Sequence, residues 1–419
     1  MSFRFSRFGE LFTRPTGALE LMDDLGHAMT GERDVAMLGG GNPGKIPAVQ
    51  AVFRRRLAEV AASQPDFDRM FGNYAHPQGE HRFRRALAEL LRREYGWHVT
   101  ADNIALTSGS QTSFFMLFNL FAGEQRNGGE RRVLLPVTPE YVGYADVGLT
   151  ENMLIARKPS LELLPERLFK YHLDLDALAI DDRIGAVCVS RPTNPTGNVL
   201  TDAEMRVLDA RCQAAQVPLI VDNAYGAPFP GIVFTDVEPV WHENIIFCMS
   251  LSKLGLPAVR TGIVVAAEPV IEALTRITAV MSLAVGSVGP VLAQPFVESG
   301  EILRLSRDEI RPFYEEKAWH AIELFKRELE GLPFRIHKPE GAIFLWLWFE
   351  GLPITSAELY ARLKQDEVYV LSGHHFFPGL DEDWPHRDEC VRVSYAQEHE
   401  AVERGIAALA REVRRAYDN

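Results

Sequence analysis

Short apolar runs alternate with helical patterns along the middle of the chain, from residue 103 onward. The runs are "NIALTSGSQ", "RRVLLPVTPEY", "GAVCVSRPTNPTG", "VPLIVDNAYG", "NIIFCMSLSK" and "TGIVVAA". Because they are apolar almost continuously, rather than at every second position, both faces of the strands they form should be buried. The pattern predicts a mainly parallel sheet covered by helices, which is an α/β domain.

A long amphipathic stretch, residues 301–331, follows and ends at a glycine, as a helix joining two domains would. Pro312 should kink this helix or begin its second half. The later runs "GAIFLWLWF", "EVYVLSG" and "CVRVSY" predict strands of a smaller α+β domain. We therefore expect an N-terminal arm associated with the small domain (1–45), a large α/β domain (46–300), and a linking helix with a C-terminal small domain (301–419).

Composition narrows the choice of partners and compartment. With 44 Lys and Arg against 57 Asp and Glu, the net charge of −13 disfavours nucleic acid and anionic membrane surfaces as partners. No apolar stretch reaches the roughly 18 residues that a membrane-spanning helix needs. The 4 cysteines have no C-x-x-C spacing, as in a protein of a reducing compartment. We expect a cytoplasmic enzyme.

Polar side chains follow several of the predicted strands, where open α/β sheets bind ligands. Ser110 and Gln111 begin an apolar helix, a position that suits a phosphate, although a plain helix cap is the commoner role of such a serine. Tyr141 and Tyr144 follow the next strand, and either ring can stack on a planar cofactor or simply pack. Asn194 lies in a turn, where it can donate to a ligand oxygen or cap the turn.

A carboxylate and an amine stand out among these positions. Asp222 directly follows the apolar "VPLIV", and a buried carboxylate normally has a cationic partner, although Asp222 can also cap a helix. Tyr225 adds a phenol within reach of the same crevice. Lys253 lies in a turn between two apolar runs. A partly desolvated lysine loses its proton more easily than at the usual pKa of about 10.4, and can then form a Schiff base with an aldehyde.

Ser250 and Arg260, on either side of Lys253, suit a phosphate dianion. Jointly, these residues describe a ligand with a phosphate, a protonatable ring nitrogen, a phenolic oxygen and an aldehyde, which is pyridoxal 5′-phosphate. Arg392, in the β-run "CVRVSY", is our candidate for the carboxylate of an amino-acid substrate, although arginines in sheets more often form salt bridges. We expect no metal, because the adjacent His374 and His375 point apart on a strand.

The stretch "GGGNPG" offers a rival interpretation, because it satisfies the G-x-G-x-x-G pattern of dinucleotide-binding proteins and has Glu59 at a tolerable distance. Against it, Pro43 and Pro47 break the tight turn, and no parallel-strand pattern precedes residue 103. We interpret the glycines as a close approach of the backbone to a small substrate, with an NAD-binding enzyme as the alternative.

The motifs "NPTG", "DNAYG" and "SLSK" with a following arginine resemble those of the fold-type I pyridoxal-phosphate-dependent aminotransferases. Further stretches such as "MLGGGNP", "PEYVGYAD" and "HKPEGAIFLWLWF" extend the resemblance from about Phe5 to the C-terminal helix. It implies a large domain with a seven-stranded type of sheet, mainly parallel, and a smaller α+β domain. It also implies transfer of an amino group, in two half-reactions, from an apolar amino acid (valine, alanine) to a 2-oxo acid (pyruvate, 3-methyl-2-oxobutanoate). A lyase or decarboxylase using the same cofactor is the alternative.

The resemblance also implies a role for each matching residue. Lys253 would hold the cofactor covalently, Asp222 would pair with its ring nitrogen, and Tyr225 and Asn194 would contact its phenolic oxygen. The phosphate would be bound by Ser110, Gln111, Ser250 and Arg260, and the ring would stack on Tyr141. Arg392 with the Gly40 backbone, and Asn194, would bind the substrate. Tyr74, in "NYAHPQGE", would reach the phosphate of a neighbouring subunit, which implies a homodimer.

Overall fold

The computed structural model describes residues 3–29 and 35–418 of the chain. Its larger sheet runs in the order β2-β11-β10-β9-β8-β4-β3, with β5 paired to β4. Strands β10, β9, β8, β4 and β5 pair with one another in parallel, in that order, whereas β11 is antiparallel to both β10 and β2, and β3 is antiparallel to β4. The strands are β2 (Ile104–Thr107), β3 (Gly123–Glu124), β4 (Glu130–Leu135), β5 (Leu154–Ala156), β8 (Ile184–Ser190), β9 (Leu219–Asp222), β10 (Ile245–Ser250) and β11 (Gly262–Val265). The mainly parallel sheet is confirmed, and the two-residue β3 adds an eighth strand at its edge.

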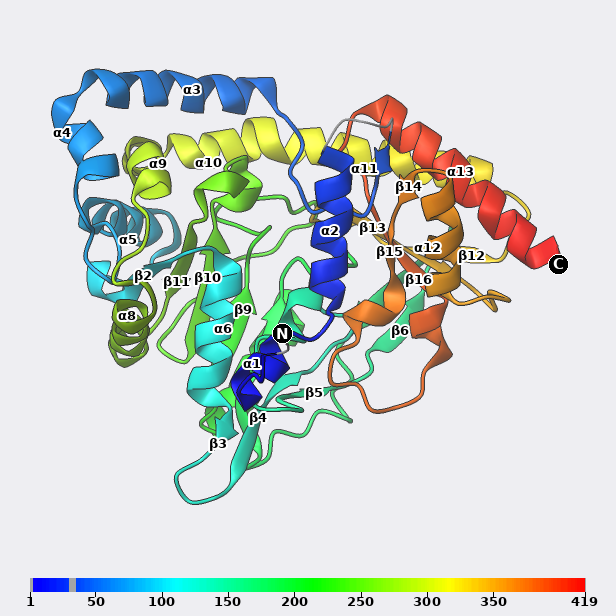
Figure 1. Ribbon diagram of the computed structural model, residues 1–419, viewed down its shortest axis with the longest axis horizontal. Coiled ribbons are helices and arrows are strands. Elements are labelled where there is room, and N and C mark those ends of the chain that lie inside the picture. The colour runs from blue at the N-terminus through cyan, green and yellow to red at the C-terminus, as the bar shows by residue number, and fades with distance from the viewer. Residues whose placement is uncertain (1–2, 30–34, 419) are drawn as a thin grey trace.

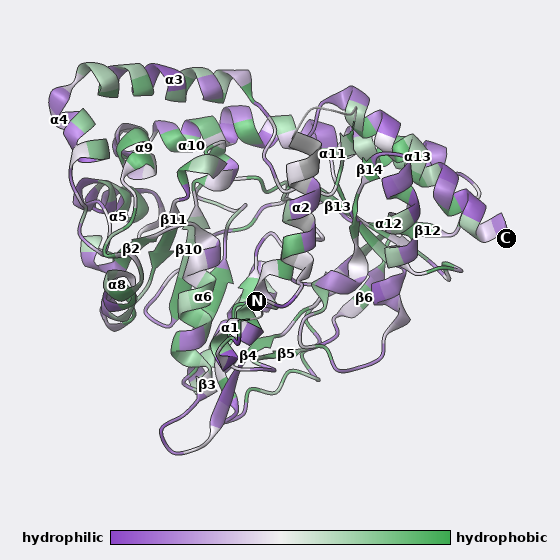
Figure 2. Cartoon of the chain, viewed as in Figure 1, coloured by the Kyte–Doolittle hydropathy of each residue, from purple (hydrophilic) through white to green (hydrophobic). Residues whose placement is uncertain are grey.

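Helices cover both faces of this sheet, and its strands β2, β8, β9, β10 and β11 are buried along their whole length, as their continuous apolar sequence predicted, whereas β4 begins with two exposed residues. Figure 2 shows these strands in the green of apolar residues, whereas the outer helices mix green with purple. The helices of this part are α3 (Pro47–Ala62), α4 (Gln64–Phe67), α5 (His81–Tyr95), α6 (Ser110–Phe121), α7 (Asp202–Ala214), α8 (Glu268–Ser282) and α9 (Val288–Ser299).

A second sheet lies on the other side of the molecule (Figure 1) and has the order β15-β16-β13-β12-β7-β6. Its strands are β6 (Ser160–Leu163), β7 (Leu168–His172), β12 (Phe334–His337), β13 (Phe344–Phe349), β15 (Leu371–Ser372) and β16 (Cys390–Ser394), with helices α12 (Ser356–Gln365) and α13 (His399–Asp418) beside them. Strands β6 and β7 come from between β5 and β8, so the chain enters the second sheet once before residue 300.

The predicted linking helix is present in three pieces. Helix α10 (Glu301–Leu305) continues through a π-helical turn, η6 (Ser306–Ile310), into α11 (Arg311–Glu328). Pro312 lies in the first turn of α11, where its missing N–H costs nothing, so it begins the second half as expected. Helix α11 then packs along α13.

The N-terminal segment packs on the second sheet and between the two halves. Its strand β1 (Ala36–Met37) pairs in parallel with β14 (Val368–Tyr369). Helix α2 (Gly17–Met29) follows α1 (Arg7–Phe12) and stands between the two sheets in Figure 1. Lys364 of α12 forms ion pairs with Glu20 and Asp24 of α2, which ties this helix to the second sheet.

Short helical turns complete the chain: η1 (Asp68–Gly72), η2 (Ala101–Asn103), η3 (Val142–Tyr144), η4 (Ser252–Leu254), η5 (Pro257–Val259), η7 (Gly373–Phe376) and η8 (Pro385–Asp388). Among the residues that the structure describes, no helix is both long and apolar enough to cross a lipid bilayer. Within the same residues, no three His, Cys, Asp or Glu side chains are grouped to hold a metal ion. All four cysteines are buried and free.

Candidate active site

The carboxyl ends of β8, β9 and β10 place polar residues from distant parts of the chain at one edge of the sheet. Ser190 ends β8 and lies in register with Asp222, which ends β9. Lys253 follows β10 in the turn η4, and Asn194 lies in the loop after β8. Parallel pairing therefore gathers them, because parallel strands all end at the same edge.

The Lys253 ammonium points to the glycine-rich segment that follows β1. It donates a hydrogen bond to the carbonyl oxygen of Gly41 and lies 5.5 Å from the centre of the Tyr225 ring. Burial, with the positive charges of Arg392 and Arg260, lowers the pKa of Lys253 from 10.5 to about 8. Near neutral pH a useful fraction of this amine is therefore uncharged and can act as a nucleophile or a base.

Asp222 is a buried carboxylate with defined partners. The Tyr144 hydroxyl donates to Oδ2 at 2.7 Å, and the backbone N–H of Ala224 donates to Oδ1 at 3.0 Å. Burial raises the pKa of Asp222 to about 6, partly offset by these two hydrogen bonds and by the charge of Lys253. A cationic ligand atom beside Asp222 would stabilise its ionised form.

The start of α6 and the loop after Lys253 form a cradle for a phosphate. Ser110 is the first residue of α6, after the N-cap Gly109, whose φ is +96°. A Cβ built on Gly109 would lie 2.1 Å from Nη2 of Arg260, so only glycine leaves this guanidinium its place against the helix start. The Ser250 hydroxyl donates to that of Ser252 at 2.9 Å, and Arg260 donates to the same Ser252 oxygen at 3.4 Å. Backbone N–H groups, hydroxyls and a guanidinium form the donor set that a phosphate dianion requires.

Gln111 lies beside this cradle and packs against the turn η3. Its side-chain N–H donates to the Gly143 carbonyl at 2.7 Å, and its Oε1 is buried with no hydrogen-bond partner among the residues that the structure describes. A phosphate dianion has no proton to donate to this oxygen, so the group of Gln111 that can bind phosphate is its backbone N–H in the first turn of α6. The residues present therefore fit pyridoxal 5′-phosphate.

Arg392 and Asn194 form a second polar cluster, facing the first. Arg392 is only 1% exposed and donates to Oδ1 of Asn194 at 2.7 Å and to the carbonyl oxygen of Gly39. The guanidinium lies 4.0 Å from the ring centre of Phe344 and 5.2 Å from that of Phe376, and within the described part of the chain its Nε has no hydrogen-bond partner. A buried guanidinium with an unused donor is suited to bind a carboxylate.

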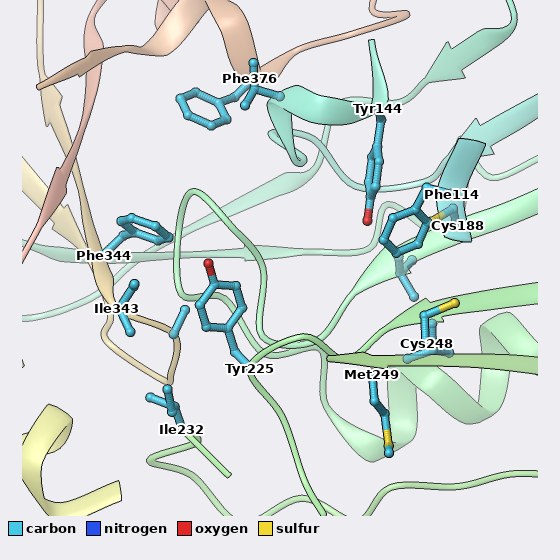
Figure 3. Close-up of a cluster of buried hydrophobic side chains, with 14 of the residues drawn as sticks. Phe114, Tyr144, Cys188, Tyr225, Ile232, Cys248, Met249, Ile343, Phe344 and Phe376 are labelled. Carbon is cyan, nitrogen blue, oxygen red and sulfur yellow. The ribbon is translucent and has the colours of Figure 1, made fainter. Parts of the chain in front are cut away.

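Aromatic side chains lie near both clusters, and Figure 3 shows Tyr144, Tyr225, Phe344 and Phe376 among the buried side chains of this region. Tyr225 is buried beside Phe344, with ring centres 6.1 Å apart, and Tyr141 stands perpendicular to Tyr144 at 5.3 Å. Burial raises the pKa of both Tyr225 and Tyr141. These phenols therefore stay protonated at neutral pH and act as hydrogen-bond donors or packing surfaces.

The structure places Gly40 in a buried position after β1, between Gly39 and Gly41, whose carbonyls bind Arg392 and Lys253. Tyr74 lies elsewhere, with 89% of its surface exposed. Sequence reasoning missed the two glycine carbonyls, which carry no side-chain signal, and it considered Tyr144 for stacking or packing but not as a hydrogen-bond donor to Asp222. It also missed Glu140 and Ser190, although a carboxylate just after a buried strand was a usable signal.

Fold and site together define an enzyme that uses pyridoxal 5′-phosphate to work on an amino acid. The chain belongs to the aminotransferase class I and II family, which it matches over residues 54–409. This membership supports the aminotransferase interpretation over the dinucleotide-binding one.

The similarity to individual relatives extends along almost the whole chain. The valine–pyruvate aminotransferase of Escherichia coli (strain K12) is 48% identical over 413 residues, which is 99% of each chain. A crystal structure of the valine–pyruvate aminotransferase from Salmonella typhimurium LT2 has a TM-score of 0.88 at 47% identity, covering 96% of this chain and 100% of that one. That of a putative amino-acid aminotransferase from Psychrobacter arcticum 273-4 has a TM-score of 0.97 at 45% identity, covering 100% of both.

Proposed function

We propose that this enzyme moves an amino group between an apolar amino acid, valine or alanine, and a 2-oxo acid, pyruvate or 3-methyl-2-oxobutanoate. The observation that carries the substrate assignment is the 48% identity, over 99% of both chains, to the valine–pyruvate aminotransferase of Escherichia coli. The rings of Phe344 and Phe376 beside Arg392 support it, because they offer apolar surface next to the group proposed to bind the substrate carboxylate.

We assign the site residues to the cofactor as follows. Lys253 would hold its aldehyde carbon, and Asp222 would pair with its ring nitrogen. Tyr225 and Asn194 would contact its phenolic oxygen, and Tyr141 would stack on its ring. The residues that bind its phosphate are Ser110, Gln111, Ser250 and Arg260. When bound, pyridoxal phosphate supplies an aldehyde for amino groups and a protonated ring that draws electron density from the substrate Cα.

The protein's own groups then perform three tasks. Arg392, with the backbone at Gly40, holds the substrate carboxylate, so that the Cα–H bond faces Lys253. Lys253 has a pKa of about 8, so a fraction of this amine is uncharged near neutral pH and takes the proton from Cα on its Nζ as a general base, and as a general acid it would then deliver this proton to the cofactor. Asp222 stays ionised, and its carboxylate would stabilise a positive charge on the ring nitrogen of the cofactor. Two half-reactions at one site predict ping-pong kinetics.

The test is a panel of amino donors with pyruvate, run on the wild type, Lys253→Ala and the control Lys326→Ala. Lys326 is a surface lysine paired with Glu166 and Glu323, so its loss should leave activity unchanged. We expect valine and alanine to be the best donors, with parallel lines in initial-velocity plots. Lys253→Ala should lose transamination and the visible absorbance of the bound cofactor. Persistence of that absorbance in Lys253→Ala would refute the role of Lys253, and preference for a charged donor would refute the substrate assignment.

We also propose a homodimer in which Tyr74 reaches the phosphate site of the neighbouring subunit. Its support is the exposure of Tyr74 (89%), next to the exposed Phe67 and Phe71 (43% and 58%). Mixed dimers of Tyr74→Ala and Lys253→Ala chains test it, because a residue acting across the interface leaves one site of each mixed dimer intact. Recovery of wild-type cofactor affinity in half of the sites is expected, and no recovery would contradict the proposal.

We propose a division into an arm (1–45), a large domain (46–300) and a C-terminal domain (301–419), except that residues 160–172 of β6 and β7 pair into the second sheet. We also propose that the enzyme lies in the cytoplasm, which its four free cysteines support. Its proposed role is in amino-acid biosynthesis. Cell fractionation tests the location.

A further inference from the structure

Glu140 is a buried carboxyl group that the proposed reaction does not use. It lies after β4, next to Tyr141, and only 1% of its surface is exposed. The backbone N–H of Ser190 donates to its Oε1 at 2.8 Å, and that of Tyr141 to its Oε2 at 3.2 Å. Its own N–H donates to the carbonyl of Phe376 in the second sheet's half of the molecule. The side chain is thus held in one position.

Two hydroxyl groups connect Glu140 to Asp222. Oε2 of Glu140 lies 2.5 Å from the Ser190 hydroxyl, which lies 3.2 Å from the Tyr144 hydroxyl, and this in turn lies 2.7 Å from Oδ2 of Asp222. These four oxygens form an unbroken row that begins at one buried carboxyl group and ends at the other. The row runs from the loop after β4 to the end of β9.

The number of protons in the row determines whether all three oxygen–oxygen contacts can be hydrogen bonds. Its three oxygen–oxygen contacts need three protons to be hydrogen bonds, and the two hydroxyls supply only two. If both carboxyls were ionised, Ser190 would donate to Glu140 and Tyr144 to Asp222. The contact between Ser190 and Tyr144 would then have no proton. A single proton on one carboxyl completes the row.

The surroundings decide which carboxyl carries that proton. The titratable and charged groups around the row are Asp222, Tyr141, Tyr144, Cys188, Cys248, Lys253, Arg260 and Arg392. Among the cations, the positive charge of Lys253 lowers the pKa of Asp222, whereas those of Arg392 and Arg260 lower the pKa of Tyr141. Burial raises the pKa of Glu140 to about 8, above the value of about 6 for Asp222.

We propose that Glu140 and Asp222 share one proton through Ser190 and Tyr144, and that Glu140 holds it while Asp222 is ionised. In this state the hydrogen bonds run in one direction: Glu140 donates to Ser190, Ser190 to Tyr144, and Tyr144 to Asp222. Moving the proton to Asp222 breaks three O–H bonds, forms three others and reverses the row. Glu140 is thus a positioning residue. It keeps Asp222 charged and keeps Oδ2 of Asp222 as the acceptor of the hydrogen bond from Tyr144. Its role at the cofactor rests on the proposed function of Asp222.

The experiment is infrared spectroscopy of the cofactor-bound enzyme without substrate, in which a protonated carboxyl is recognised by its carbonyl stretch. In the wild type at neutral pH we expect this band, and it should fade as the pH rises through about 8. Glu140→Gln should lack the band. The control Glu412→Gln should keep it, because Glu412 is a buried carboxylate of α13 whose partner is Arg415.

A second variant tests the connection itself. In Tyr144→Phe the row is cut, so Ser190 can donate to an ionised Glu140 without leaving a contact unfilled. The midpoint at which the band fades should therefore fall by at least one pH unit, a tenfold loss of proton affinity. Absence of the band from the wild type, its survival in Glu140→Gln, or an unchanged midpoint in Tyr144→Phe would each overturn the proposal. Because no substrate is present, these results are independent of the assignment of valine and pyruvate.

Discussion

Replacing Gly109 with alanine should weaken cofactor binding through the phosphate alone. The residue has φ +96° and ψ 156°, a region that only glycine adopts readily, so alanine adds about 1–3 kcal/mol of backbone strain. Its Cβ would also lie 2.1 Å from Nη2 of Arg260. The exposed Arg260 side chain can move away, and the protein then loses the charge-assisted hydrogen bond from Arg260 to the phosphate of the cofactor. Such a bond contributes about 1.5–3 kcal/mol to binding. The dissociation constant should rise by about tenfold to about a hundredfold.

The assay is a titration of the cofactor-free protein with pyridoxal phosphate, followed by its absorbance, and repeated with pyridoxal, which has no phosphate. Gly96→Ala is the matched control, because Gly96 also has a positive φ (+66°) but a Cβ there meets nothing within 4 Å. It should cost about 1 kcal/mol of stability and leave cofactor affinity unchanged. Wild-type affinity in Gly109→Ala, or an equal loss for pyridoxal, would refute the phosphate cradle.

Three further predictions concern the charged residues of the site. Asp222→Asn should retain some cofactor but lose most turnover, because an amide cannot balance a ring cation; near-normal kcat would contradict this role. Arg392→Lys should raise KM for both substrates more than tenfold, because a lysine cannot bridge Asn194 and Gly39 as the guanidinium does; an unchanged KM would argue against carboxylate binding. Lys253 has a pKa of about 8 when folded and 10.5 otherwise, so the unfolded chain binds this proton more tightly. The free energy of unfolding of the cofactor-free protein should therefore rise between pH 8 and 10.5, by at most about 3–4 kcal/mol. Denaturant titrations should show this rise in the wild type but not in Lys253→Met, and equal slopes in both would contradict it.

Much of the fold was predictable because its signals are local. A strand buried on both faces needs an apolar residue at nearly every position, and β8, β9 and β10 show this in seven, four and six residues that are all buried. Pro312 likewise marked a helix start from its own chemistry. The membership of β6 and β7 in the second sheet carried no such signal, because strand pairing depends on partners far away in the sequence.

The sequence by itself determined which residue types could build the site: an amine, a carboxylate, an asparagine, serines and arginines, each next to an apolar run or within one. Only the tertiary structure decided their distances and environments. The reactivity of Lys253 depends on burial and on the charges of Arg392 and Arg260, which are set by the packing of two sheets. The row from Glu140 to Asp222 exists because β8 and β9 lie in parallel register, so that Ser190 stands beside Asp222. Hydrogen bonds act over about 3 Å, a range in space that no spacing along the chain can specify.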